Sequence, residues 1–198
     1  GDCLDIMPSI PDRSIDMILC DLPYGTTACK WDVVIPFEPL WEQYNRIIKD
    51  QGAIVLFGQE PFSSYLRMSN IKDYRYDWIW EKSNISGFLN VRWIPLKAHE
   101  NISIFYKKPG KYNHNAKDLE KVRFRKERGS EAYNRVDANE QTQTGFPKSI
   151  LKYKNERGFH PTQKPVALLE YLIKTYTLEN ETVLDNCMGS GSTGVACI

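Results

Sequence analysis

Short apolar runs alternate along the chain with longer stretches in which apolar residues recur every three or four positions. Five runs predict buried strands, at residues 15–20, 53–57, 74–80, 102–106 and 182–184. The longer spacing predicts helices at 37–49 and 165–176, one beginning at Pro61, and one after the glycines near the end. Strands and helices that alternate through short connections are typical of an α/β protein with a mainly parallel sheet.

The composition indicates a globular chain. Its 198 residues are 41% hydrophobic and 26% charged, which suits one domain, or one domain carrying an insert. No apolar run reaches the roughly 18 residues of a membrane-spanning helix, and the first residues lack the apolar stretch of a secretory signal. The chain begins without Met and stops at Ile198 inside a motif, so we expect a piece of a longer protein.

Charge is segregated along the chain although the net charge is only +1. Residues 107–157 hold 14 Lys and Arg against 7 Asp and Glu, a balance of +7, and the remaining residues hold 12 against 18, a balance of −6. A basic segment on an acidic body is typical of a protein with a polyanionic partner. A solvated insert explains the same composition, and the sequence leaves both interpretations open.

Five cysteines are spread over the chain without a C-x-x-C pair, and the three histidines lie far apart in sequence. This spacing predicts no zinc site and favours a reduced, cytoplasmic setting. Cys20 and Cys187 lie in or beside apolar runs, where a cysteine usually fills space in the core.

A glycine-rich loop follows the last predicted strand and leads into a helix. Gly189, Gly191 and Gly194 match the pattern G-x-G-x-x-G, in which glycines let the backbone approach a ligand closely. No Gly-Lys-Ser/Thr follows, so the loop is not a P-loop. Asp185 ends the strand, and its carboxylate suits a cationic amino or sulfonium ligand better than a pyrophosphate. A plain tight turn is the alternative.

A second polar loop, Asp21-Leu22-Pro23-Tyr24, follows the first predicted strand. The Asp21 carboxylate and a backbone carbonyl held by the rigid Pro23 supply two acceptors, which an exocyclic amino group with two donors requires. Tyr24 offers a flat face on which a planar base can stack. Both loops follow carboxyl ends of strands, where open α/β sheets bind ligands. The alternative here is an ordinary turn at the end of a strand.

Together these motifs resemble the DNA amino-methyltransferases that use S-adenosylmethionine. Residues 21–24 are similar to the family's catalytic motif [DNS]-P-P-[YFW], and residues 185–191 are similar to its cofactor loop. Residues 160–165, His-Pro-Thr-Gln-Lys-Pro, resemble its additional cofactor-side motif, and residues 99–102 with Lys107 are also similar to the family. The catalytic motif precedes the cofactor loop, an order that resembles the circularly permuted β-type subgroup with a target-recognition insert.

The resemblance implies a Rossmann-like, mostly parallel sheet with helices on both faces, circularly permuted and carrying a basic recognition insert. It divides the chain into a catalytic half at 1–106, the insert at 107–157 and a cofactor-binding half at 158–198, which we expect to be truncated. The implied partner is double-stranded DNA, with no membrane and no metal, in a prokaryotic or phage-encoded protein. A homodimer and a cognate restriction endonuclease are left open.

The resemblance also assigns site residues. The catalytic set is Asp21, Leu22, Pro23 and Tyr24. The S-adenosylmethionine set is Asp2, Thr162, Lys164, Asp185, Gly189 and Gly191. The DNA-binding set is the densest basic cluster of the insert, Lys121, Arg123, Arg125, Lys126 and Arg128. Leu22 departs from the family motif because it replaces the first proline, which reduces loop rigidity.

Several activities fit these motifs. Asp21 at the first motif position favours N6 of adenine as the methyl acceptor, with N4 of cytosine as the alternative. An RNA base or a glutamine amide presents the same planar amino group. A truncated domain that binds DNA without cofactor is a non-enzymatic alternative. The glycines alone also suit a nicotinamide-dependent oxidoreductase, but the placement of Asp185 and residues 21–24 counts against it.

Overall fold

A computed structural model of the chain describes residues 1–114, 117–125, 128–130, 133–136, 139–156 and 163–198. The chain forms two compact units. The first, called here the sheet unit, consists of Gly1–Asn113 and Ser149–Ile198. The second, called the small unit, consists of His114–Lys148.

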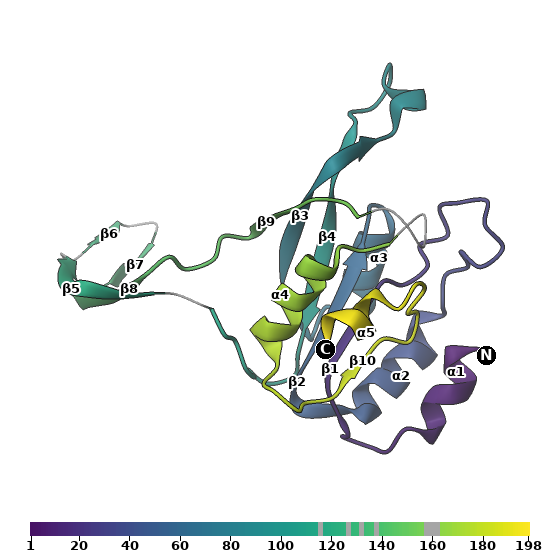
Figure 1. Ribbon diagram of the computed structural model, residues 1–198, viewed down its shortest axis with the longest axis horizontal. Coiled ribbons are helices and arrows are strands. Elements are labelled where there is room, and N and C mark those ends of the chain that lie inside the picture. Colours follow the sequence, from purple (N-terminus) through teal and green to yellow (C-terminus); the bar gives the residue numbers. More distant parts are fainter. Residues whose placement is uncertain (115–116, 126–127, 131–132, 137–138, 157–162) are drawn as a thin grey trace. The chain divides into compact units, whose positions relative to one another are not determined.

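The described part of the sheet unit is built on a six-stranded sheet with the strand order β10-β1-β2-β4-β3-β9 (Figure 1). The strands are β1 (Ile15–Cys20), β2 (Ile48–Gly58), β3 (Tyr74–Ser86), β4 (Lys97–Phe105), β9 (Ile150–Tyr153) and β10 (Val183–Leu184). β1 runs parallel to β2 and β10, β3 runs parallel to β9, and β4 is antiparallel to β2 and β3. All of these strands except β4 therefore point the same way, which confirms the expected mostly parallel α/β sheet.

Helices cover both faces of the sheet, as the sequence predicts (Figure 1). One face carries α1 (Cys3–Ile6), η1 (Met7–Ser9), α2 (Phe37–Ile47) and α3 (Phe62–Ser69), and the other carries α4 (Val166–Tyr176) and α5 (Ser192–Ala196). Successive side chains of β1 point to opposite faces: Cys20 enters the core under α2, and Leu19 enters the core under α4. No described helix has the length and apolar composition that crossing a membrane requires.

The apolar spacing of α4 explains its place on the sheet. Leu168, Leu169, Leu172 and Tyr176 lie on one side of the helix and are buried. The helix begins directly after Pro165, at a position where the missing N–H of proline costs no helical hydrogen bond. The same reasoning holds for α2, whose buried residues are also spaced three or four apart.

Several strands differ from the ranges that the sequence predicts. β3 continues to Ser86 instead of ending at 80, and β4 covers Lys97–Phe105 instead of 102–106. Two further differences have a clear physical reason. β2 begins at Ile48 rather than at 53 because Ile48 pairs with Ile15 of β1, so the predicted helix at 37–49 ends earlier, at 47. β9 is absent from the sequence prediction. It pairs with β3 at the edge of the sheet and buries only Leu151, so it is too short and too polar to show a pattern.

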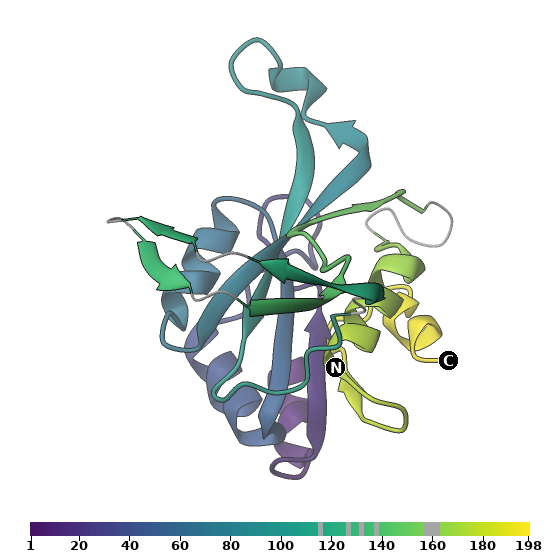
Figure 2. The same cartoon turned by 90° about the vertical axis from the view of Figure 1, so that its left-hand side faces the viewer.

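The small unit contains two antiparallel strand pairs, drawn in teal and green in Figure 2. β5 (Lys117–Arg125) pairs with β8 (Asn139–Thr144), and β6 (Arg128–Ser130) pairs with β7 (Tyr133–Val136). This unit spans fewer residues than the insert expected at 107–157. One reason is that β9 belongs to the six-stranded sheet. The division of the chain into three functional segments stays a prediction.

Leu172 tests the assigned core of the sheet unit, because its side chain is fully buried under α4. Leu172→Ala should lower the free energy of unfolding by about 2–5 kcal/mol, since it removes buried methyl groups and leaves a cavity. Lys174→Ala is the control on the same helix. Its side chain is exposed and its 3.5 Å ion pair with Glu170 is worth about 0.5 kcal/mol or less. Urea unfolding measures the stability of both variants. An equal loss of unfolding free energy in the two would contradict the placement of Leu172 in the core.

Candidate active site

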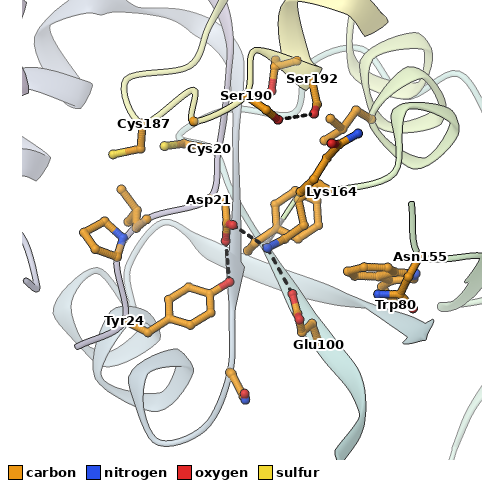
Figure 3. Close-up of a pocket in the computed structure, with 18 of the residues that line it drawn as sticks. Cys20, Asp21, Tyr24, Trp80, Glu100, Asn155, Lys164, Cys187, Ser190 and Ser192 are labelled. Carbon is orange, nitrogen blue, oxygen red and sulfur yellow. Dashed lines mark hydrogen bonds and ion pairs between the residues drawn. The ribbon is translucent and has the colours of Figure 1, made fainter. Parts of the chain in front are cut away.

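A cavity of about 930 Å³ opens at the carboxyl ends of β1, β2 and β10. Its wall is formed by the loops after these strands, by facing residues of β3 and β4, and by the segment that precedes α4. Figure 3 shows Asp21, Trp80, Glu100 and Lys164 around this cavity, with Cys187 of the glycine loop. Every described residue that lines the cavity belongs to the sheet unit. The two loops singled out by the sequence therefore meet in one place.

Asp21 follows the last residue of β1 and is held by two side chains. Its Oδ1 accepts a hydrogen bond of 2.6 Å from the Tyr24 hydroxyl, and its Oδ2 pairs with the Lys164 ammonium. A carboxylate offers about four acceptor positions, so two stay available to a ligand. Burial raises the pKa of the Tyr24 hydroxyl, as do the charges of Asp21 and Glu100, so this hydroxyl stays a donor.

Lys164 lies buried between two carboxylates (Figure 3). Its Nζ is 3.4 Å from Oε2 of Glu100 on β4, and Oε1 of Glu100 accepts a 3.1 Å hydrogen bond from Lys82 of β3. Burial alone lowers the pKa of the Lys164 ammonium, but Asp21 and Glu100 outweigh it and raise that pKa. Burial likewise works to raise the pKa of Glu100, and the two lysines bring it below its usual value. Lys164 and Glu100 therefore both stay charged at neutral pH.

Asp185 follows β10 and orders the glycine loop. Its carboxylate accepts hydrogen bonds from the Cys187 N–H at 3.0 Å and from the Thr193 hydroxyl at 2.6 Å. Burial raises the pKa of this carboxyl, so a cationic ligand beside it would favour the ionised form. Gly189 and Gly191 have φ of +50° and +78°, where other residues are strained. A Cβ at Gly189 would meet no atom closer than 4.0 Å, so its backbone borders open space.

Most of the predicted site residues line this cavity. They are Asp21, Leu22, Pro23, Tyr24, Lys164, Asp185 and Gly189. Gly191 is the residue before α5 and lies outside the lining set, as does Asp2, which accepts a hydrogen bond from the Leu4 N–H at the start of α1. Thr162 lies outside the described residues. The role of each residue stays a prediction.

The predicted DNA-binding residues belong to the small unit. Lys121, Arg123 and Arg125 lie in β5 and Arg128 lies in β6, where the structure describes the backbone alone. Lys126 lies outside the described residues. Their contact with DNA stays a prediction.

Asp32 orders the loop after Tyr24, a role that no pattern in the sequence indicates. Its two oxygens accept hydrogen bonds from the N–H groups of Gly25, Thr26 and Thr27 at 2.8, 2.9 and 2.7 Å. Burial works to raise the pKa of Asp32, but hydrogen bonding from the Thr27 side chain and from these three N–H groups brings it below its usual value. A carboxylate that binds backbone five to seven residues earlier has no sequence signature. The pairing of Glu100 with two lysines is likewise absent from the sequence prediction.

Fold and site define a Rossmann-like α/β protein whose ligand cavity lies where an acidic-aromatic loop meets a glycine loop. The family model N6_N4_Mtase, a DNA methylase family, matches residues 15–198. The chain belongs to this family, which confirms the resemblance seen in the sequence. Within the described residues, no group of three or more His, Cys, Asp or Glu side chains is arranged to hold a metal ion.

The similar curated proteins are bacterial type II methyltransferases. M.HpaI of Haemophilus parainfluenzae is 29% identical over the whole chain, which covers 65% of that protein. M.HinfI of Haemophilus influenzae is 29% identical over 98% of the chain, which covers 59% of that protein. The chain thus spans less than two thirds of the length of both.

Two solved structures share the fold. The M1.HpyAVI–SAM complex has a TM-score of 0.64 and 25% identity, with 100% of this chain and 85% of that chain covered. The PvuII DNA methyltransferase, named as cytosine-N4-specific, has a TM-score of 0.69. The match covers 99% of this chain and 75% of the PvuII chain. Its identity is 15%, so this second likeness shows the fold alone.

Asp32→Asn should destabilise the protein by about 1.5–3 kcal/mol at pH 7, because an amide NH₂ would face backbone N–H donors that now bind a carboxylate. The folded-state pKa of Asp32 is lowered, so its ionisation stabilises the folded state above the unfolded pKa of about 3.9. This contribution is lost as pH falls through the lower, folded pKa. The stability difference between wild type and variant should therefore shrink below about pH 4.

Urea unfolding at pH 7 and at several lower pH values measures that difference. Asp5→Asn is the matched control, because Asp5 is exposed in α1 and its replacement should change stability by about 0.5 kcal/mol or less. An Asp32→Asn variant as stable as this control would contradict the role assigned to Asp32.

Proposed function

We propose that the protein transfers a methyl group from S-adenosylmethionine to the exocyclic amino group of a DNA base, N6 of adenine. The observation that carries the proposal is that Asp21 and the loop of Asp185 and Gly189 line one cavity. The first suits an amino group with two donors, and the second suits a cationic cofactor. Membership of the DNA methylase family supports the same reaction.

Asp21 would hold the amino group of the base. Its carboxylate and the backbone carbonyl of Leu22 would accept the two N–H bonds and so fix the amino nitrogen relative to the methyl donor. Positioning two reactants in this way supplies a large part of a rate enhancement, without a metal or a covalent nucleophile. Tyr24 would stack on the base, and its hydroxyl bond to Asp21 holds the ring at the cavity wall.

The other end of the cavity fits S-adenosylmethionine. When bound, this cofactor supplies a methyl group on a positively charged sulfonium. Asp185 offers a partly buried carboxylate, the backbone at Gly189 is open to a ligand, and the hydroxyls of Ser190 and Ser192 lie beside Gly189. A volume of about 930 Å³ lies near the upper end of the range for ligand sites, which leaves room for a base as well as a cofactor.

The proposed substrate is double-stranded DNA from which one base has left the stack. Extruding a base costs a few kcal/mol, which stacking on Tyr24 and phosphate contacts elsewhere would partly offset. The excess of seven positive charges in residues 107–157 supports such contacts. The similar curated proteins are bacterial type II methyltransferases. We therefore propose that the protein acts in the bacterial cytoplasm as a modification enzyme, together with a cognate restriction endonuclease.

Asp21→Ala should reduce methyl transfer by about 10³-fold while the Kd for S-adenosylmethionine changes less than about threefold, because Asp21 binds the amino group and not the cofactor. Transfer is measured with labelled cofactor and DNA from a methyltransferase-deficient host, and cofactor binding by isothermal titration. Asp185→Ala is the complementary variant and should weaken cofactor binding. Asp5→Ala, at an exposed position of α1, is the control for unchanged activity.

Nucleoside analysis of the labelled DNA identifies the acceptor. N6-methyladenine is the expected product, whereas N4-methylcytosine would move the assignment to the alternative base. A wild-type protein that binds no cofactor would overturn the enzymatic proposal. Transfer by Asp21→Ala at the wild-type rate would show that Asp21 is not the amino-binding residue.

Changing Lys121, Arg123 and Arg125 to Gln should weaken DNA binding and reduce the slope of log K against log salt by about 1–3, since each lost phosphate contact contributes about 0.9. The matched control changes three basic residues of the sheet unit, Lys72, Arg75 and Lys174, all of them exposed. Fluorescence anisotropy with labelled duplex DNA measures both slopes. An insert variant with the wild-type slope would favour the solvated-insert interpretation.

A further inference from the structure

Five side chains from four segments form a continuous series of contacts along the cavity wall. In order they are Tyr24, Asp21, Lys164, Glu100 and Lys82. Figure 3 shows the contacts among the first four of them. The first two come from the loop after β1, the third from the segment before α4, and the last two from β4 and β3. We call these five residues the Lys164 network.

Lys164 occupies the centre of this network. Its side chain is 9% exposed, and that of Glu100 is 13% exposed. The ammonium contacts the two carboxylates on either side and lies 5.1 Å from the centre of the Phe57 ring. These contacts direct the ammonium towards Asp21, the residue proposed to bind the amino group.

The energetics of burial make this arrangement rigid. A buried ammonium is costly unless charged or polar groups surround it, and removing one partner of a buried ion pair is strongly destabilising. Lys164 therefore cannot leave Asp21 without losing a large favourable interaction. Glu100 holds Lys164 from the other side and is itself held by Lys82 at 3.1 Å.

We propose that Lys164 is a positioning residue that fixes the Asp21 carboxylate for the amino group of the base, with Glu100 and Lys82 anchoring Lys164. This inference rests on the proposed function. The ammonium occupies one oxygen of Asp21 and the Tyr24 hydroxyl occupies the other, so rotation of the carboxylate is restricted from both sides. Reactive groups must be held to within about 0.5 Å of their productive geometry, which a side chain held from one side alone achieves poorly.

Opposite charges compensate one another within the network. Asp21 and Glu100 are two of the carboxylates that line the cavity, and Lys164 and Lys82 are the two lysines that contact them. The raised pKa of Lys164 and the lowered pKa of Glu100 agree with an ionised pair at these two positions. A neutral residue at 164 would remove a cation from beside both Asp21 and Glu100. Asp21 would then be held by the Tyr24 hydroxyl alone.

Cofactor binding, the role that the sequence resemblance implies for Lys164, makes the opposite kinetic prediction. Replacing a residue that binds the cofactor raises the Kd for S-adenosylmethionine and leaves the rate at saturating cofactor unchanged. A positioning residue acts on the rate at saturating cofactor and DNA and leaves that Kd unchanged.

The test compares Lys164→Met with Lys164→Arg, Glu100→Gln and Lys82→Met. Single-turnover methyl transfer at saturating cofactor and DNA should fall about 10²-fold in Lys164→Met, since a misplacement of about 1 Å can cost that much. Lys164→Arg keeps the charge and should recover about tenfold of this loss. Glu100→Gln and Lys82→Met act through Lys164 and should show smaller losses, of about tenfold and about threefold. Lys152→Met is the control, because its exposed side chain pairs with Glu81 outside the network.

Isothermal titration supplies the second readout, and the Kd for S-adenosylmethionine should change less than about threefold in Lys164→Met. A Kd raised tenfold or more with an unchanged saturating rate would show that Lys164 binds the cofactor and would overturn the proposal. An unchanged rate together with an unchanged Kd would overturn it as well. Thermal unfolding identifies a variant that fails to fold, in which case Lys164→Arg and Lys82→Met carry the comparison.

Two further measurements need no methyl transfer. Titration of the Glu100 carboxyl by ¹³C NMR should show a pKa below the usual value in the wild type and a higher pKa in Lys164→Met, because a neighbouring cation is lost. A crystal structure of Lys164→Met should show Asp21 in a changed or multiple side-chain conformation. If the wild type transfers no methyl group to DNA, the proposed function fails. The crystal structure then still decides whether Lys164 fixes Asp21, and the titration whether Lys164 acts on Glu100.

Discussion

β1 and β10 are paired in parallel, and the Asp16 carboxylate reinforces this pairing by accepting the N–H of Thr182 at 3.0 Å, across 166 positions of sequence. Because the two strands run in the same direction, the loops that begin at Asp21 and Asp185 leave the sheet at the same edge. A slip of one residue would turn the side chains of β1 to the wrong faces of a sheet that is buried on both sides. The two loops therefore meet because β1 and β10 are paired, and neither loop forms part of that pairing.

The loop after β1 is held in place without the first proline of the family motif. Leu22 takes that position and is buried, 3% exposed, in the core under α2, where burial of a leucine side chain contributes about 1.5–3 kcal/mol. Asp32 binds three consecutive N–H groups beyond the motif, and Lys164 holds Asp21 within it. Packing at Leu22 and hydrogen bonds on both sides thus supply the rigidity that a second proline would otherwise give.

Local pattern predicted the elements of the sheet unit whose buried residues are contiguous or regularly spaced, such as β1, α2 and α4. It also predicted the two loops at the strand ends, because their residue types are unusual after apolar runs. It could not predict β9, which buries one side chain, or the early start of β2, which depends on pairing between Ile48 and Ile15. The contacts of Lys164 with Asp21 and Glu100 were equally out of reach, since they join residues far apart in sequence and their charges alone do not identify partners.

The segregated charge of the chain agrees with the two ligands of the proposed reaction. A cationic cofactor favours carboxylates at its site, whereas DNA favours lysine and arginine, and oppositely charged side chains on one surface would pair with one another. In the sheet unit such pairing does occur, because three lysines of the basic segment contact carboxylates of the remaining residues: Lys108 with Asp50, Lys111 with Glu181 and Lys152 with Glu81. Ion pairs between exposed side chains are weakened by water and salt, so each contributes little to stability. Inside the cavity screening is weak, and there Lys164 and Lys82 lie directly against Asp21 and Glu100.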